Sequence, residues 1–319
     1  MNIRNLKDQP LDEIQVKKAG RQIKGFLIGL LKVVIIIGIS YIILGPLITI
    51  IANSFFTAND LYNPVVMLLP AEGTLQNYIT SFTRMTYPRT LATTFAYVIS
   101  LTLIQILICS MAGYGFARYE FPFKKVLFGC VILTIVIPND TLMLPLYTQF
   151  RNFDIFGILH LVTGHGINLL STEVPMYIMT VLGCGLRSGL YIYIFNQFFR
   201  GLPKEVEEAA VVDGAGSYFR IMLVNAMPSV LTVSIFSLVW QYNDTFYAKL
   251  FSINSKLLMS MRISTLRASI EFIDQIKDTA VSQLYLYAGI VLMVIPIVII
   301  YILLQKRFIE GASRSGIVG

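Results

Sequence analysis

The chain consists of long uncharged apolar segments separated by shorter polar ones. No charged residue occurs in residues 33–59 or 90–117, and each stretch exceeds the roughly 20 apolar residues that a helix needs to cross a bilayer. Similar apolar segments run over residues 221–242 and 282–304. These four stretches predict four membrane-spanning helices.

Two further apolar segments are interrupted. Residues 126–147 contain Pro138, Asp140 and Pro145, and residues 175–199 contain Arg187. Charges at membrane depth are costly and face the bundle interior or water. Asp140 and Arg187 are therefore expected to pair with one another between helices, which is favoured, or else to line a path or lie in loops. Counting both segments as crossings, we expect an all-α integral membrane protein with six transmembrane helices.

Composition and charge support this class and orient the chain. Of the 319 residues 55% are hydrophobic and only 13% are charged, against roughly 25% charged in soluble domains. Lysine and arginine concentrate in residues 1–24, 118–125 and 306–314, which predicts that both termini are cytoplasmic. The net charge of +7 thus indicates cytoplasmic loops and not nucleic-acid binding. Residues 245–280 oppose this topology with five basic residues, but Glu271, Asp274 and Asp278 accompany them.

The sequence offers no catalytic or metal site. Three cysteines in apolar runs form neither a disulfide framework nor a metal-ligand spacing, and His160 and His165 are interpreted as loop residues. The phosphate loop G-x-x-x-x-G-K-[ST], the HExxH motif, the serine nucleophile elbow and the dinucleotide fingerprint are all missing from the sequence. We therefore assign no catalytic residue, metal or cofactor, and the chain is not expected to be an enzyme.

An acidic stretch, "GLPKEVEEAAVVDGAG" at 201–216, predicts a short surface helix between the fourth and fifth crossings. Pro203 suits a first helical position, acids suit the first turns, and Gly214 and Gly216 supply a stop. A helix lying on anionic cytoplasmic lipid would be basic, so a protein partner is favoured over a connector on the membrane surface.

This stretch resembles the EAA loop of permease subunits of ATP-binding-cassette importers, in the extended form of the carbohydrate, MalG-type branch. Five other stretches are similar to that branch and occur in its order. They are "AGYGFARYEFPFKK" (112–125), "MLPLY" (143–147), "FNQFFRGLP" (195–203), "IFSLVWQYND" (235–244) and the C-terminal "PIVIIYILLQKRFIEGASRSGIVG". The resemblance covers about residues 25–319. Residues 156–190 look longer than usual, which leaves open a later start of the fourth helix.

The resemblance implies a type I importer transmembrane-domain fold in the cell membrane, with a cytoplasmic tail (1–24) and a permease domain (25–319). The chain would be a non-catalytic subunit for a sugar or oligosaccharide, and ATP would be bound by a partner. Implied partners are a second permease subunit, an ATPase dimer, an extracellular solute-binding protein, the carbohydrate and membrane lipid, with no nucleic acid. The coupling loop, at about 201–220, would contact the ATPase through Glu207, Glu208, Ala209, Ala210, Asp213 and Gly214.

A sugar path needs aromatic faces and neutral hydrogen-bonding groups. The candidates on the later helices are Tyr177, Tyr191, Asn196, Trp240, Tyr242 and Asn243. Tyrosine and tryptophan also form interfacial belts, and this alternative applies to each. Two other functions stay open. An ion-gradient-driven secondary transporter would require carboxylates at mid-membrane and an inverted repeat. Asp140 is the one carboxylate in the sequence that meets the first requirement. A membrane scaffold without transport is the third. The sequence leaves the particular carbohydrate open.

Overall fold

A computed structural model of the chain describes residues 11–155, 157–158, 161, 164–203, 205, 208, 222–253 and 258–315. Within these residues the regular structure is helical, with one isolated antiparallel bridge between Phe153 and Ile167. The chain divides into two units, Met1–Thr74 and Leu75–Gly319, and each is described by itself.

The first unit contains the helices α1 (Leu11–Asn53) and α2 (Ala58–Tyr62). The apolar part of α1, Ile23–Asn53, is long enough to cross a membrane, which agrees with the first predicted crossing. The helix begins earlier than that crossing, inside the stretch expected to be a tail, and ends at Asn53 and not at residue 59. Four residues later, Thr57 caps the start of the next helix.

Asp60 ties the loop after α2 back onto the helix start. Its carboxylate accepts hydrogen bonds from the backbone N–H groups of Thr57 (3.0 Å), Ala71 (2.9 Å) and Glu72 (3.2 Å). The Thr57 side chain caps the N–H of Asp60 in return, which completes a capping box. These bonds to the charged form, led by that from Thr57, lower the pKa of Asp60 to about 2.

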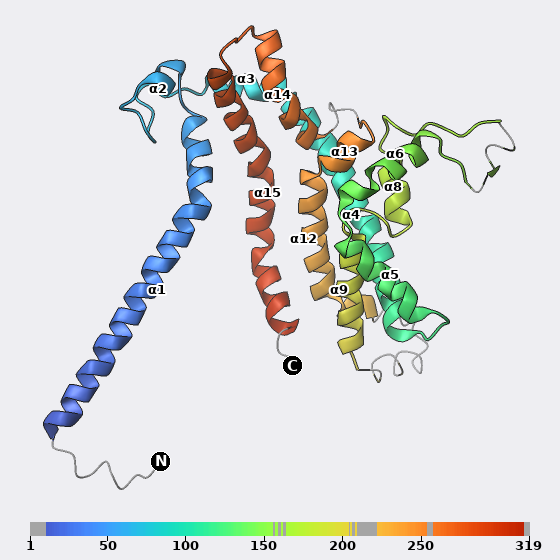
Figure 1. Ribbon diagram of the computed structural model, residues 1–319, viewed down its shortest axis with the longest axis horizontal. Coiled ribbons are helices and arrows are strands. Elements are labelled where there is room, and N and C mark those ends of the chain that lie inside the picture. Colours follow the sequence, from blue (N-terminus) through green and yellow to red (C-terminus); the bar gives the residue numbers. More distant parts are fainter. Residues whose placement is uncertain are drawn as a thin grey trace. The chain divides into compact units, whose positions relative to one another are not determined.

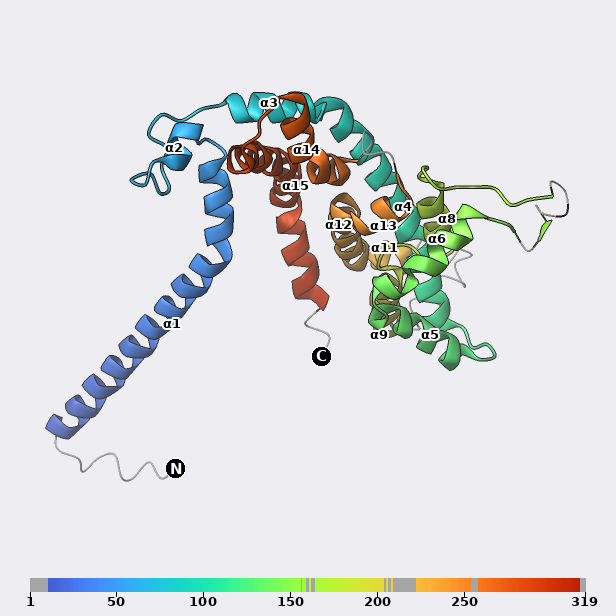
Figure 2. The ribbon, with the colours of Figure 1, turned by 45° about the horizontal axis from the view of Figure 1, so that its top comes forward.

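The second unit is a helical bundle organised around α4 (Figures 1 and 2). Its elements are α3 (Gln76–Arg84), α4 (Tyr87–Arg118), α5 (Lys124–Val136), η2 (Asn139–Leu142), α6 (Met143–Arg151), α8 (Val174–Val181), α9 (Ser188–Gly201), α11 (Leu223–Asn225), α12 (Met227–Asn243), α13 (Phe246–Leu250), α14 (Met259–Ile273) and α15 (Thr279–Ser315). Helix α4 packs against α8, α9 and α12, while α15 packs against α3, α12 and α14.

The second and sixth predicted crossings correspond to the long helices α4 and α15. Both are long and apolar enough to span a membrane, over Tyr87–Arg118 and Thr279–Leu303. The third corresponds to a broken pair, Lys124–Val136 and Asn139–Arg151, bent by 107°. Ile137 is extended before Pro138, because a proline ring disfavours helical backbone at the preceding residue. Among the described residues there are thus three spanning helices, or four if the bent pair is one span.

The fourth predicted crossing is not one helix. Helix α8 ends at Val181 and α9 begins at Ser188, so the continuous helix starts later than residue 175. The backbone between them turns through positive φ at Gly183 (+72°) and Arg187 (+60°), which a helix does not tolerate. The fifth crossing corresponds to α12, which begins at Met227, after a turn at Ala226, and has 17 residues.

The buried apolar side chains form two clusters at successive levels of α4. One includes Val98 and Leu101 of α4 with Met176 of α8 and residues of α13 and α14. The other includes Cys109 and Tyr114 with Phe195 and Phe199 of α9. Because both clusters use α4, its position controls the packing of the whole second unit.

Candidate functional site

Gln105 of α4 connects three helices through a buried polar network. Its Nε2 donates to the backbone oxygen of Leu186 (2.7 Å) and to Ser188 Oγ (2.9 Å) at the start of α9. Its Oε1 accepts from Ser237 Oγ of α12 (2.7 Å). Gln105, Ser188 and Ser237 are all buried. Unpaired polar groups are costly inside a membrane, so this network holds the broken α8–α9 connection against α4 and α12.

Helices α4 and α9 approach closely at Gly113. A Cβ placed there would lie 2.6 Å from Cβ of Phe195, 2.9 Å from the backbone nitrogen of Asn196 and 3.0 Å from the carbonyl oxygen of Ile192. Asn196 Nδ2 donates to the Gly113 carbonyl oxygen (3.3 Å). Small residues allow such close approach of helices in membranes. The contact fixes the end of α9 that leads into the predicted coupling loop.

Three of the predicted path residues lie in packed interior positions. Tyr242 is buried and its hydroxyl donates to the backbone oxygen of Met293 of α15 (2.8 Å). Tyr177 shares a 2.6 Å hydrogen bond with Ser100 of α4. Tyr191 is buried, and its hydroxyl has no hydrogen-bond partner within the described residues. The first two of these hydroxyls therefore join helices.

The other three predicted path residues differ from one another. Asn196 is buried and borders a cavity between α4, α5 and α9. Trp240 is half-buried and packs against Arg187. Asn243 is exposed and donates to the carbonyl oxygen of Val239 on its own helix (2.8 Å). The six residues thus occupy separate environments, and their role in a sugar path stays a prediction.

The favoured ion pair between Asp140 and Arg187 does not form in the part of the chain that the structure describes. Arg187 instead lies over the ring of Trp240, with Cζ 3.9 Å from the ring centroid, which is cation–π geometry. Asp140 is exposed in η2, the turn after the bend at Pro138. Both charges lie at helix breaks, which agrees with the weaker alternative of loop placement.

The predicted coupling loop lies mostly outside the described residues. Glu207, Ala209, Ala210, Asp213 and Gly214 are outside them, as is His160. Glu208 is helical and exposed. The start of the loop is tied to α4, because Arg118 Nη2 donates to the backbone oxygen of Leu202 (2.9 Å). The end of α4 and the entry to this loop are thereby linked.

The end of the second unit away from the predicted coupling loop contains α3 and α14 (Figure 1), and two pairs of charged side chains lie there. Arg84 binds Asp274 through both carboxylate oxygens, with Nε 3.0 Å from Oδ2. Arg267 Nε donates to Glu271 (2.8 Å). The hydrogen bond to Asp274 raises the pKa of Arg84, and the bond from Arg267 lowers the pKa of Glu271. Of the basic residues at 245–280, Arg267 is thus paired within its own helix, and Asp274 is paired with a residue from outside that segment.

The family follows from comparison with known proteins. Residues 105–313 match the family of binding-protein-dependent transport system inner membrane components. A probable ABC transporter permease protein from Pyrococcus horikoshii is 30% identical over 281 residues, covering 86% of this chain and 92% of that protein. The chain belongs to this family of membrane permeases, and it is a multi-pass protein of the cell membrane.

Other relatives carry substrates in their names. The diacetylchitobiose uptake system permease protein NgcG from Streptomyces coelicolor is 25% identical, covering 86% of this chain and 84% of that protein. The arabinooligosaccharides transport system permease protein AraQ from Halalkalibacterium halodurans is 28% identical, covering 88% and 93%. The fold is shared with a chain of a bacterial ABC transporter involved in the import of alginate, with TM-score 0.66 at 19% identity, covering 89% of this chain and 98% of that chain.

Proposed function

We propose that the chain is the permease subunit of an ATP-driven importer for a sugar or oligosaccharide. The observation that carries this proposal is the set of relatives named for diacetylchitobiose and arabinooligosaccharides, each aligned over most of both chains. The ordered motifs of the sequence point to the same branch. The subunit forms the translocation path and is itself non-catalytic, since ATP is bound by a separate ATPase.

The proposed topology has six crossings with both termini in the cytoplasm. It is supported by the basic residues Arg118, Lys124, Lys125 and Arg200, which lie at one end of the second unit, where α4 and α9 end and α5 begins. Positive residues of this kind favour the cytoplasmic side. In this topology the bent α5–α6 pair, α8 with α9, and α12 supply the third, fourth and fifth crossings.

The proposed coupling element is the loop at about 201–220. Its acids can accept hydrogen bonds from arginine or lysine of the ATPase, and its alanines allow close docking. The Arg118–Leu202 hydrogen bond supports a mechanical role, because movement of the loop entry would act on the end of α4. The close contact of Gly113 with α9 would carry that movement into the bundle.

The complex would contain a second permease, an ATPase dimer and an extracellular solute-binding protein. The binding protein would contact the end formed by α3 and α14, which faces outward in this topology. Ser264 of α14 is exposed there. A cysteine at Ser264 should therefore cross-link to the binding protein during turnover, and no capture under turnover counts against this contact.

The first experiment is a tagged pull-down of the chain from detergent-solubilised membranes, with partners identified by mass spectrometry. Stoichiometric recovery of an ATPase and a second permease supports the proposal. A chain recovered alone, or only with itself, overturns it and favours a secondary transporter.

The second experiment tests coupling in the purified complex with Gly214→Leu. The sequence predicts that Gly214 ends the coupling helix, and a side chain at a left-handed helix end costs about 1–2 kcal/mol. We expect sugar uptake per ATP hydrolysed to fall. Gly129→Leu is the matched control, because Gly129 lies on α5, outside the proposed loop, and a Cβ there meets nothing within 4 Å. Normal coupling in Gly214→Leu would exclude the coupling role.

A further inference from the structure

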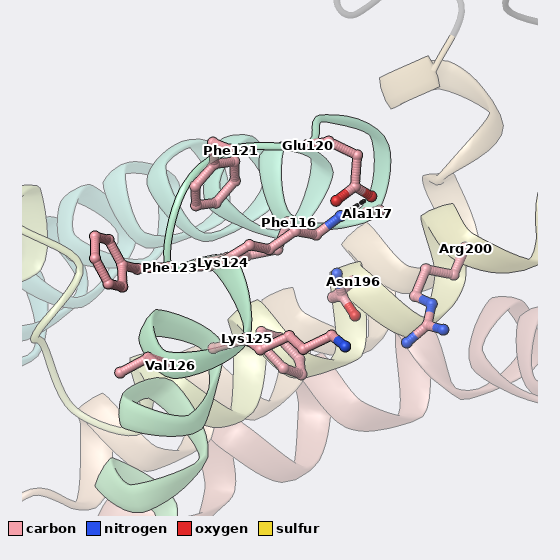
Figure 3. A pocket seen from close by; sticks show the side chains of 11 residues that line it. Phe116, Ala117, Glu120, Phe121, Phe123, Lys124, Lys125, Val126, Asn196 and Arg200 are labelled. Atoms are coloured by element: carbon pink, nitrogen blue, oxygen red, sulfur yellow. Dashed lines mark hydrogen bonds and ion pairs between the residues drawn. The ribbon is translucent and has the colours of Figure 1, made fainter.

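A charged cavity of about 570 Å³ lies where α4 ends, α5 begins and α9 approaches its C-terminus. Figure 3 shows its side chains, with Lys125, Asn196 and Arg200 converging from α5 and α9. The cavity is separate from the predicted path residues except for Asn196. Its lining is therefore a second feature of the bundle that the transport role does not explain.

The cavity carries an excess of positive charge. Lys124 Nζ pairs with Glu120 at 2.8 Å, whereas Lys125 and Arg200 make no ion pair with any described residue. Both of these side chains are exposed. Lys124 is also the first residue of α5, a 13-residue helix whose N-terminal end contributes positive potential. Two cations that have no ion pair among the described residues, placed beside a helix N-terminus, favour an anionic ligand.

Aromatic side chains line the same cavity, so its ligand is amphipathic. Phe116, Phe121, Phe123 and Phe128 lie beside the cations. Phe123 is 78% exposed and so reaches outward. A soluble anion would gain little from these rings. A lipid presents an anionic headgroup and an acyl chain side by side, and basic pockets between helices on the cytoplasmic side suit such headgroups.

Asn196 lies in the wall of the cavity and holds α9 against α4. Its side chain is 1% exposed, and its Oδ1 has no hydrogen-bond partner within the described residues. Nδ2 is occupied by the Gly113 carbonyl oxygen, so Oδ1 is left as an acceptor. A buried acceptor without a donor is costly. Because the Oδ1 atom itself is shielded from solvent, we assign no headgroup contact to Asn196.

We propose that this cavity binds an anionic glycerophospholipid. The phosphate contacts Lys125 and Arg200, and an acyl chain lies along the phenylalanines. The proposal rests on the proposed topology, which places this end at the cytoplasmic leaflet. Bound lipid would brace the end of α9 directly before the coupling loop, so that transport would respond to anionic lipid.

The test uses the complete importer complex purified in a neutral detergent and analysed by native mass spectrometry. The probes are phosphatidylglycerol, phosphatidylcholine with the same acyl chains, and inorganic phosphate. The double variant Lys125→Gln/Arg200→Gln is compared with wild type, and Lys249→Gln is the matched control because that exposed lysine lies on α13. Recovery of all subunits in each variant shows that the complex still assembles, so a loss of lipid binding is distinguished from a failure of the proposed complex.

We expect the double variant to bind phosphatidylglycerol about thirty-fold more weakly, from about fivefold for each surface cation. The Lys249→Gln complex should bind as wild type. Both of these should bind phosphatidylcholine more weakly than phosphatidylglycerol, and the double variant should lose this preference. Equal binding of phosphatidylglycerol by wild type and the double variant overturns the proposal. Displacement of the lipid by millimolar phosphate would assign the cavity to a soluble anion instead. Cross-linking of Lys125 to an acidic residue of the ATPase in the lipid-loaded complex would assign it to a protein contact, which also overturns it.

Discussion

Replacing Gly113 by alanine should separate α4 from α9. The added methyl would meet the backbone nitrogen of Asn196 at 2.9 Å and the carbonyl oxygen of Ile192 at 3.0 Å, besides Cβ of Phe195 at 2.6 Å. Backbone atoms cannot rotate away as a flexible side chain can. Helix α9 must therefore shift as a body, and the Asn196–Gly113 hydrogen bond shifts with it.

The size of the effect follows from two opposing contributions. Overpacking in a tight interior costs about 1–3 kcal/mol, and backbone contacts place this site in the upper part of that range. Alanine in place of glycine inside a helix stabilises the helix by up to about 1 kcal/mol. Gly113→Ala should thus lower the free energy of unfolding by about 1–2 kcal/mol. Gly115→Ala, two residues along α4, meets nothing within 4 Å and should be neutral or stabilising.

The assay uses the thiol of Cys109, which is buried in the same cluster one helical turn before Gly113. Cys130 and Cys184 are exposed and are first replaced by serine. Maleimide then reacts with Cys109 only when α4 and α9 open locally. A difference of about 2 kcal/mol between the two alanine variants corresponds to about thirty-fold faster labelling in Gly113→Ala. Equal labelling rates and equal melting temperatures in both variants would refute the argument that Gly113 is there for close approach.

Three further outcomes are expected. Gln105→Met should lower the free energy of unfolding by about 1–3 kcal/mol, because it leaves buried polar groups on α9 and α12 without their hydrogen-bond partner. The control Gln149→Met, at an exposed position, should have no effect on thermal melting. The pKa of Asp60 lies at about 2 in the folded chain, below the usual value of about 3.9. The stabilisation of the loop by ionised Asp60 is therefore complete above pH 4 and is lost as the pH falls toward 2. Hydrogen-exchange protection of residues 57–73 should decrease over that range in wild type and be insensitive to it in Asp60→Asn; a pH-independent wild type would contradict this. Removing Arg84 and Asp274 singly and together should give a coupling energy of about 1 kcal/mol that shrinks in 1 M salt, and a zero coupling at low salt would show that the pair is not stabilising.

The apolar pattern predicted the helical membrane class because a bilayer imposes length and composition on any segment that crosses it. It located the long helices α4 and α15 and the interruption near Pro138. It did not distinguish the prolines. Pro138 accompanies a 107° bend, whereas Pro46 and Pro296 lie inside continuous helices. Whether a proline breaks a helix depends on which neighbours satisfy the freed backbone groups, and only the tertiary structure supplies those neighbours.

The site residues show the same division. Tyr242 and Asn243 are adjacent in sequence and both suit a sugar path, but one is buried against α15 and the other is exposed. Gln105 was not singled out, although a glutamine in an apolar segment is a usable signal of an interior contact. Its partners Ser188 and Ser237 are 83 and 132 residues away. Helix periodicity determines which face a residue occupies, whereas the choice of the facing helix is made only when the bundle packs.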